Sequence, residues 1–161
     1  MQDTEKKLTG PNDRKKPPSK AQRLVNRAIV RANVAVYRAS GGKIAGRFGE
    51  LPVLLLTTRG RKTGIARTSA LGYIPDGDRY VICGAYGGEP VHPAWALNLR
   101  AIPGAVVEVG RQRFKVTARE LPAGAERDRL WQRMVDIFPL YGKFETKTGR
   151  LFPIVVLTPV D

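Results

Sequence analysis

The stretch that decides the fold is residues 51–85, which read LPVLLLTTRGRKTGIARTSALGYIPDGDRYVICGA. It begins with a continuous apolar run, Leu51–Thr58, which is typical of a central, fully buried strand. A glycine-punctuated turn, Arg59–Gly64, leads into a second predicted strand, Ile65–Ile74. An Asp-Gly pair then predicts a hairpin turn before a third strand, Arg79–Ala85. Strands that follow one another through short turns indicate an antiparallel sheet.

Beyond this stretch the chain mixes short helices with further strands. We expect a short helix from Pro93 to about Ala101, strands at Ala105–Val109 and Arg113–Arg119, a helix over Ala123–Phe138, a loop over Pro139–Leu151 and a last strand at Phe152–Thr158. Strands and helices do not alternate regularly, and no G-x-G-x-x-G or P-loop motif opens a helix, so a parallel nucleotide-binding sheet is disfavoured. The pattern predicts a mainly β protein with flanking helices, built as a closed or nearly closed antiparallel barrel.

The N-terminal part divides into an arm and a helix. Residues 1–18 are rich in basic residues and proline and nearly lack apolar side chains, which predicts a disordered basic arm. Ser19 followed by Gln22 has the form of a capping box and predicts an amphipathic helix over residues 19–40. Its apolar face consists of Leu24, Val25, Ala28, Ile29, Ala32 and Val36. Residues 41–161 then form the barrel domain.

Composition limits the classes of function. Lys and Arg number 28 against 14 Asp and Glu, a formal net charge of +14, which favours nucleic acid, an anionic membrane surface or a polyanionic small molecule as partner. One cysteine, Cys83, and one histidine, His92, argue against a disulfide scaffold and a multi-histidine metal site, so we expect no metal. No apolar stretch approaches the roughly 20 residues that span a bilayer. The N-terminus has no signal-peptide pattern, and we expect a cytoplasmic protein.

The first candidate site is the turn between the first two strands. Arg61, Lys62 and Thr63 lie between two glycines, and Arg67 follows on the next strand. Glycines let backbone N–H groups approach an anion, and Arg and Lys supply donors for phosphate. The turn is therefore either a phosphate or carboxylate cradle or a solvated hairpin tip in a basic protein.

The second candidate follows the third strand. Gly87 and Gly88 permit the backbone to approach a flat ligand. Trp95 offers an aromatic face, and Asn98 offers an amide about one helical turn later. The alternative is that Trp95 and Leu99 pack into the core.

The third candidate is an aromatic cluster after the long predicted helix, formed by Phe138, Tyr141 and Phe144. These rings either wall an apolar substrate pocket or form a satellite core under a loop.

Six short motifs follow one another along the chain. They are Leu55–Gly64, Asp76–Val81, Gly87-Gly88, His92–Leu99, the Phe-Pro-x-Tyr that starts at Phe138, and Pro153–Leu157. In this order, from about Ala39 to the C-terminus, they resemble the deazaflavin-dependent nitroreductase family. The resemblance implies a split β-barrel like that of FMN-binding oxidoreductases and the coenzyme F420, an 8-hydroxy-5-deazaflavin with a phosphate and a polyglutamate tail.

The resemblance also implies roles for single residues. The phosphate and tail would meet Arg61, Lys62, Thr63 and Arg67. The deazaflavin ring would meet Ala85, Tyr86, Gly87, Gly88, Trp95, Asn98 and Leu99. The acceptor pocket would be formed by Phe138, Tyr141 and Phe144. Our own hypothesis, beyond the resemblance, is that Tyr141 donates a proton or a hydrogen bond to the reduced acceptor.

The expected activity is hydride transfer from reduced deazaflavin to a small apolar acceptor, a quinone or a nitroaromatic. Members that reduce nitroimidazoles often carry a lysine where this chain has Tyr86, and tyrosines where it has Phe138 and Phe144. These departures make a quinone the first choice. The alternatives are an FMN- or tetrapyrrole-binding split barrel and a basic nucleic-acid-binding protein, the latter disfavoured because the basic residues are not interleaved with aromatics.

The surroundings of the helix over residues 19–39 stay open. A basic amphipathic helix is typical of contact with a membrane surface, here the inner face of the cell membrane, close to a membrane-soluble quinone. The alternative is that its apolar face packs on the barrel or on a second subunit. The oligomeric state is not predicted.

Overall fold

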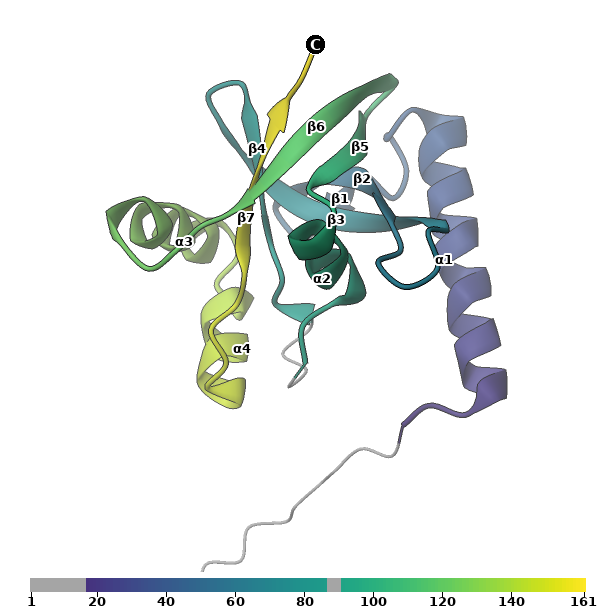
Figure 1. Ribbon diagram of the computed structural model, residues 1–161, viewed down its shortest axis with the longest axis horizontal. Coiled ribbons are helices and arrows are strands. Elements are labelled where there is room, and N and C mark those ends of the chain that lie inside the picture. Colours follow the sequence, from purple (N-terminus) through teal and green to yellow (C-terminus); the bar gives the residue numbers. More distant parts are fainter. Residues whose placement is uncertain (1–16, 87–90) are drawn as a thin grey trace, which may run out of the picture.

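The computed structural model describes residues 17–86 and 91–161 (Figure 1). Its centre is an antiparallel sheet of seven strands in the order β1-β2-β3-β4-β7-β6-β5. The strands are β1 (Arg47–Phe48), β2 (Leu51–Arg59), β3 (Ala66–Asp76), β4 (Arg79–Cys83), β5 (Gly104–Val109), β6 (Gln112–Glu120) and β7 (Ile154–Pro159). A further pairing of β2 with β5 joins the two sides of the sheet, so all strands except β1 form a closed barrel. The predicted mainly β barrel is confirmed.

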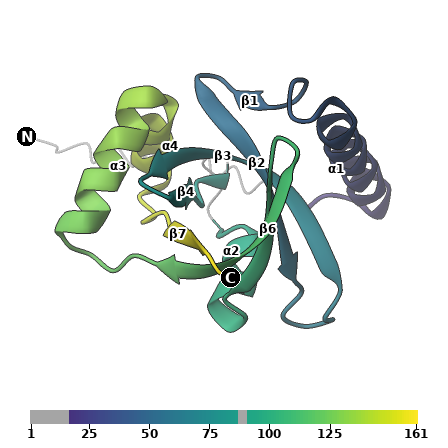
Figure 2. The ribbon, with the colours of Figure 1, turned by 90° about the horizontal axis from the view of Figure 1, so that it is seen from above.

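Three of the four helices in the described residues lie on two sides of the barrel, and one packs against its interior. The helices are α1 (Lys20–Ser40), α2 (Ala94–Ala101), α3 (Ala125–Ile137) and α4 (Leu140–Thr148). Figure 2 shows α3 and α4 on one side of the strands and α1 on the opposite side. Among the described residues, no helix combines the length and the apolar character needed to cross a bilayer.

Strand β2 is buried along most of its length because both of its faces are covered. Leu54 and Leu56 point to the interior, where they pack with α2. On the outer face, Val53 and Leu55 pack against α1. This double cover explains why β2 reads as a continuous apolar run instead of an alternating one.

Helix α1 begins as the sequence predicts but presents an unexpected face to the barrel. The Ser19 hydroxyl oxygen accepts a hydrogen bond from the Gln22 backbone N–H at 3.2 Å, which confirms the predicted cap. Only Val34 and Tyr37 of α1 are buried. The Tyr37 hydroxyl donates to the Val53 carbonyl oxygen (2.9 Å) and accepts from the Gly110 N–H (2.9 Å).

The predicted apolar face of α1 does not pack on the barrel, so that half of the alternative is wrong, while packing on a second subunit stays a prediction. Leu24 is 65% exposed, Val25 57% and Ile29 54%. The sequence pattern found an amphipathic helix correctly, but the few side chains that attach it lie on another face. Periodicity alone does not say which neighbour a helical face meets.

The predicted loop over Pro139–Leu151 is also wrong, because most of it is helix α4. Pro139 stands at the N-cap, where its missing N–H is not needed for helical hydrogen bonding. Tyr141 supplies the buried contact of α4, with its ring 6.1 Å from the ring of Trp131 on α3. The two-residue strand β1 was not predicted. Most of the predicted arm at residues 1–18, and both Gly87 and Gly88, lie outside the described residues.

Candidate functional site

The basic turn, residues Arg59–Gly64, joins β2 to β3 and is closed by its own backbone. The Gly60 N–H donates to the Ile65 carbonyl oxygen at 2.9 Å, and the Gly64 N–H donates to the Gly60 carbonyl oxygen at 2.8 Å. Gly64 has φ of +71°, a left-handed conformation that glycine adopts at little cost. The turn is thus a tight platform for its side chains.

The cations at this turn meet no carboxylate in the described part of the chain. Arg59, Arg61, Lys62 and Arg67 take part in none of the ion pairs found there. Six other arginines do reach carboxylate oxygens: Arg38, Arg79, Arg100, Arg119, Arg129 and Arg133. The turn therefore concentrates positive charge that the described fold does not neutralise, which is what an anion cradle requires.

Asn98 links this turn to α2. Its Oδ1 accepts hydrogen bonds from the backbone N–H and the Nη1 of Arg61, both at 3.1 Å. Its Nδ2 donates to the Thr58 Oγ1 at 3.2 Å. The side chain is buried, at 4% exposure, and its amide is engaged at both ends. Asn98 therefore holds the turn in place. Its position one helical turn after Trp95 suggested contact with a ligand and did not suggest this structural role.

A cavity of about 430 Å³ opens between α1, β1, β3, the end of β4 and α4. We call it the acceptor cavity, after the acceptor pocket that the resemblance implies for Tyr141 and Phe144. Its lining residues are Asn33, Ala45, Arg47, Phe48, Val53, Ala70, Leu71, Gly72, Cys83, Ala85, Tyr86, Tyr141 and Phe144. Of the predicted site residues it brings together Ala85, Tyr86, Tyr141 and Phe144.

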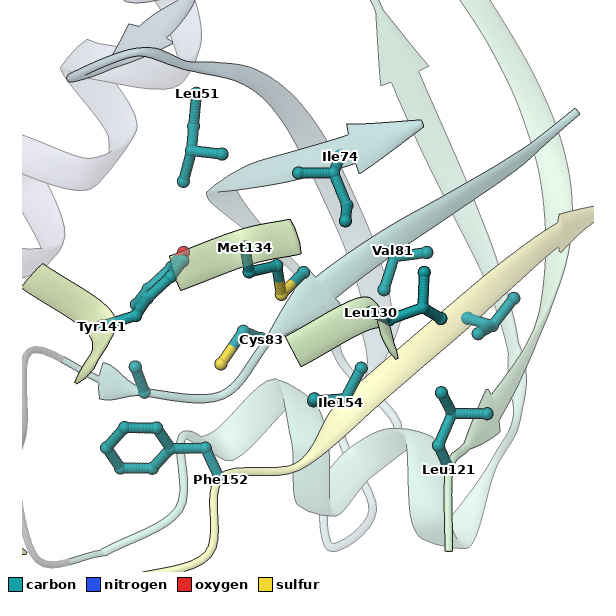
Figure 3. Packing of buried hydrophobic residues seen from close by; sticks show 12 residues of the cluster. Leu51, Ile74, Val81, Cys83, Leu121, Leu130, Met134, Tyr141, Phe152 and Ile154 are labelled. Carbon is teal, nitrogen blue, oxygen red and sulfur yellow. The ribbon is translucent and has the colours of Figure 1, made fainter. Parts of the chain in front are cut away.

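Two titratable groups of this cavity stay neutral near pH 7. Tyr141 and Cys83 belong to the buried cluster that joins α3 and α4 to the barrel (Figure 3). Burial raises the pKa of Tyr141 well above its usual value and raises the pKa of Cys83 to about 12. Tyr141 therefore keeps its proton and is a hydrogen-bond donor, and Cys83 stays a thiol.

The other predicted residues lie around the cavity or away from it. Phe138 does not line it, but its ring stands 5.0 Å from the ring of Tyr141 and 5.1 Å from that of Phe48. Trp95 and Leu99 pack inside the barrel, as the core alternative predicted. Their contact with a cofactor ring stays a prediction.

Sequence reasoning missed a brace behind the cavity. The Arg150 guanidinium donates to the carbonyl oxygens of Gly84 (3.2 Å) and Ala85 (3.0 Å) and to the His92 Nδ1 (2.7 Å). Burial and, next, the nearby Arg150 charge lower the pKa of His92, so its ring is neutral and accepts this bond. Arg150 thus ties the segment after β4 to the segment before α2. No local pattern signals this contact, because the two side chains lie 58 positions apart.

A second cavity, of about 410 Å³, lies near the basic turn where the ends of β2 and β5 meet β6. Arg59, Arg113 and Lys115 line it together with apolar side chains. None of the predicted cradle residues lines it. Within residues 17–86 and 91–161, no group of three or more His, Cys, Asp or Glu side chains is placed to hold a metal ion.

A closed antiparallel barrel with a mostly apolar cavity at one side and a basic turn without carboxylate partners in the described chain at another defines a class, the split-barrel proteins. The Vibrio cholerae heme storage protein HutZ shares this fold at 14% identity, with a TM-score of 0.52 over 82% of this chain and 91% of that chain. The family model described as F420H(2)-dependent quinone reductase matches residues 29–159. The chain belongs to this family.

Two similar proteins agree with this assignment. The F420H(2)-dependent quinone reductase Rv1261c of Mycobacterium tuberculosis is 40% identical over 140 residues, which cover 85% of this chain and 94% of that protein. A solved F420-H2 dependent reductase is 36% identical, with a TM-score of 0.61 over 66% of this chain and 93% of that one. The predicted family, the split barrel, the oxidoreductase class and F420 as cofactor are confirmed.

Proposed function

We propose that this protein reduces a quinone-like acceptor, which binds in the acceptor cavity beside the ring of F420. The observation that carries the proposal is the cavity itself. It is walled mainly by apolar and aromatic side chains, adjoins Ala85 and Tyr86, and holds a neutral hydroxyl donor, Tyr141. A flat, apolar molecule with carbonyl oxygens matches such walls.

The basic turn fits the tail of the cofactor. Phosphate and several carboxylates need cations that are not already paired, and Arg61, Lys62 and Arg67 meet no carboxylate in the described chain. Arg61, Lys62, Thr63 and Arg67 would hold the phosphate and tail, with Asn98 fixing the direction of Arg61. When bound, F420 supplies hydride chemistry, because a deazaflavin has carbon in place of the flavin N5.

The residues around the ring would position it and exclude water. Residues 41–161 form the cofactor-binding domain in this proposal. Arg150 holds the carbonyl oxygens of Gly84 and Ala85, so these two residues directly after β4 offer a fixed edge. Ala85 and Tyr86 would contact the ring, together with Gly87, Gly88, Trp95, Asn98 and Leu99. Rigid positioning of the two reactants lowers the entropic part of the barrier.

Tyr141 would donate a hydrogen bond from its Oη to an acceptor oxygen, while Phe144 forms the wall beside it. Phe138 supports the Tyr141 ring from outside the cavity. A hydroxyl that keeps its proton can stabilise negative charge as it develops on the acceptor. Replacing Tyr141 with Phe should lower kcat about tenfold or more with quinones and leave F420 binding unchanged. Unchanged turnover would remove Tyr141 from this role.

The central experiment is equilibrium binding of F420, followed by fluorescence, with FMN as the comparison ligand. Lys62→Ala should weaken F420 binding and reduce its salt dependence. Lys43→Ala is the matched control, because Lys43 is also exposed but lies outside the basic turn. Turnover of quinones and nitroaromatics by the F420-loaded protein then tests the acceptor class. Tighter binding of FMN than of F420, or no turnover of any quinone, would refute the proposal.

We also propose that α1 rests on an anionic membrane surface, at the inner face of the cell membrane. The supporting observation is its exposed apolar face next to basic side chains such as Arg23, Arg27 and Arg31. Each basic residue near an anionic leaflet adds about 1 kcal/mol. Co-sedimentation with phosphatidylglycerol vesicles, but not phosphatidylcholine vesicles, is the expected result. Ile29→Glu should abolish it and Val160→Glu, at another exposed apolar position, should not. Equal behaviour of the two variants would refute the contact.

A further inference from the structure

One wall of the acceptor cavity comes from a part of the chain that no recognised motif covers. Asn33 on α1, and Ala45, Arg47 and Phe48 between α1 and β2, all line the cavity. We propose that Arg47 is a specificity-determining residue that makes the enzyme prefer acceptors with an anionic substituent on an aromatic ring. This inference rests on the proposed function of the cavity.

The wall that carries Arg47 is held in place by its own contacts. The Ser40 hydroxyl oxygen accepts from the Ile44 N–H at 3.0 Å, and the Gly46 carbonyl oxygen accepts from the Val53 N–H at 3.0 Å. A Cβ added at Gly46 would stand 1.8 Å from the Gly42 carbonyl oxygen, so the backbone at Gly46 lies directly against the backbone at Gly42. These contacts fix the segment that leads into Arg47.

Two residues with an unfavourable backbone conformation line the same cavity. Ala45 has φ of +59° and Tyr86 has φ of +50°, and they are the non-glycine residues with positive φ in the described chain. Both line the acceptor cavity. Left-handed backbone is unfavourable for a residue with a Cβ, and such strain concentrates where a ligand is held. The segment of Arg47 therefore shares a feature with the segment of Tyr86, which the resemblance assigns to the site.

The charge of the cavity points to the chemistry of its ligand. Arg47 is the one charged side chain among the described lining residues, and no carboxylate lines the cavity with it. Its guanidinium donates to the Glu50 carbonyl oxygen at 3.4 Å and takes part in no ion pair within the described chain. A planar guanidinium beside apolar walls suits a carboxylate or sulfonate attached to a ring. Asn33 adds an amide to the same wall.

The test compares two acceptors with the same ring, a neutral naphthoquinone and a sulfonated naphthoquinone. The ratio of their kcat/KM values is measured for the F420-loaded wild type and for Arg47→Gln. Lys43→Gln is the matched control, because it removes the same charge from the same segment at an exposed residue that does not line the cavity. Arg47→Gln should lower the ratio of anionic to neutral acceptor about tenfold, with Lys43→Gln changing it less than twofold.

A binding measurement keeps this inference separate from the proposed function. Quenching of tryptophan fluorescence by the sulfonated ring reports occupancy without turnover, since Trp131 lies against Tyr141 of the cavity. If no quinone turns over but the sulfonated ring binds about tenfold more weakly to Arg47→Gln, the proposed activity fails and the role of Arg47 stands. An unchanged affinity or ratio in Arg47→Gln, or an equal fall in Lys43→Gln, would overturn the inference. A thermal melt of each variant confirms that it is folded.

Discussion

Replacing Asn98 tests whether the basic turn is an organised cradle. Asn98→Ala removes three hydrogen bonds, two accepted from Arg61 and one donated to Thr58. At about 1 kcal/mol for each bond, the free energy of unfolding should fall by about 2–3 kcal/mol. For a chain of 161 residues this lowers Tm by about 5–10 °C. Arg61 would lose its fixed direction, and F420 affinity should fall about tenfold.

Asn98→Asp tests the hydrogen bonds that hold the turn separately from the positive charge that would bind the cofactor phosphate. A carboxylate accepts both bonds from Arg61, and the Thr58 hydroxyl can donate to it, so stability should return to within about 1 kcal/mol of the wild type. The added negative charge lies against Arg61 and competes with the cofactor phosphate. F420 should therefore bind to Asn98→Asp at least as weakly as to Asn98→Ala.

The assay is urea unfolding of the cofactor-free variants together with fluorescence titration of each with F420. Wild-type stability in Asn98→Ala would show that these bonds contribute nothing to the fold. Wild-type F420 affinity in Asn98→Asp would show that the phosphate lies elsewhere. Either result refutes the reasoning that connects α2 to the cradle.

Tyr37 and Cys83 are buried and His92 is half-buried, and each gives a prediction of its own. Tyr37→Phe removes the hydroxyl that bridges Val53 and Gly110 and should lower the free energy of unfolding by about 1–3 kcal/mol; Tyr73→Phe, which lacks such a bridge, should change it far less in the same urea titration. The lowered pKa of His92 means that the unfolded chain takes up a proton first as the pH falls through about 6.5. Stability should therefore decline from pH 7 to pH 5, and His92→Gln should flatten that decline. Cys83, whose pKa burial raises to about 12, should resist iodoacetamide at pH 8 in the native protein and react once urea unfolds it, as mass spectrometry would show.

The barrel was predictable because its signals are local. The apolar run of β2 and the Asp-Gly turn before β4 specify pairing between neighbours in sequence, and β2, β3 and β4 lie where these signals place them. Helix α4 was not predicted, since its sequence begins after Pro139 and contains Gly142, both of which weaken the local signal of a helix. Proline at a helix start costs little, and burial of Tyr141 outweighs one glycine.

The sequence predicted some residues that the structure brings together in the candidate site but not the contacts that join them, and the roles of these residues stay predictions. Motif order identified the basic turn and the aromatic residues Tyr141 and Phe144, which the structure places at a turn and in a cavity. The brace from Arg150 to His92 and the cavity lining by Arg47 depend on how distant segments meet in space. A single sequence carries no local sign of such contacts. The residues next to Arg150 and Arg47 in the sequence do not indicate which distant segment each side chain meets.

Helix α1 has a thermodynamic consequence of its own. Every side chain from Lys20 to Asn33 is exposed, so this stretch obtains almost no tertiary stabilisation from the barrel. A helix of that length is only marginally stable in water. A surface that covered this stretch would stabilise the helix, and any ordering entropy would be subtracted from the binding free energy. Asn33, the last residue of this exposed stretch, also lines the acceptor cavity, so a ligand that binds better when Asn33 is helical would stabilise the helix by the same free energy that the formed helix adds to its binding.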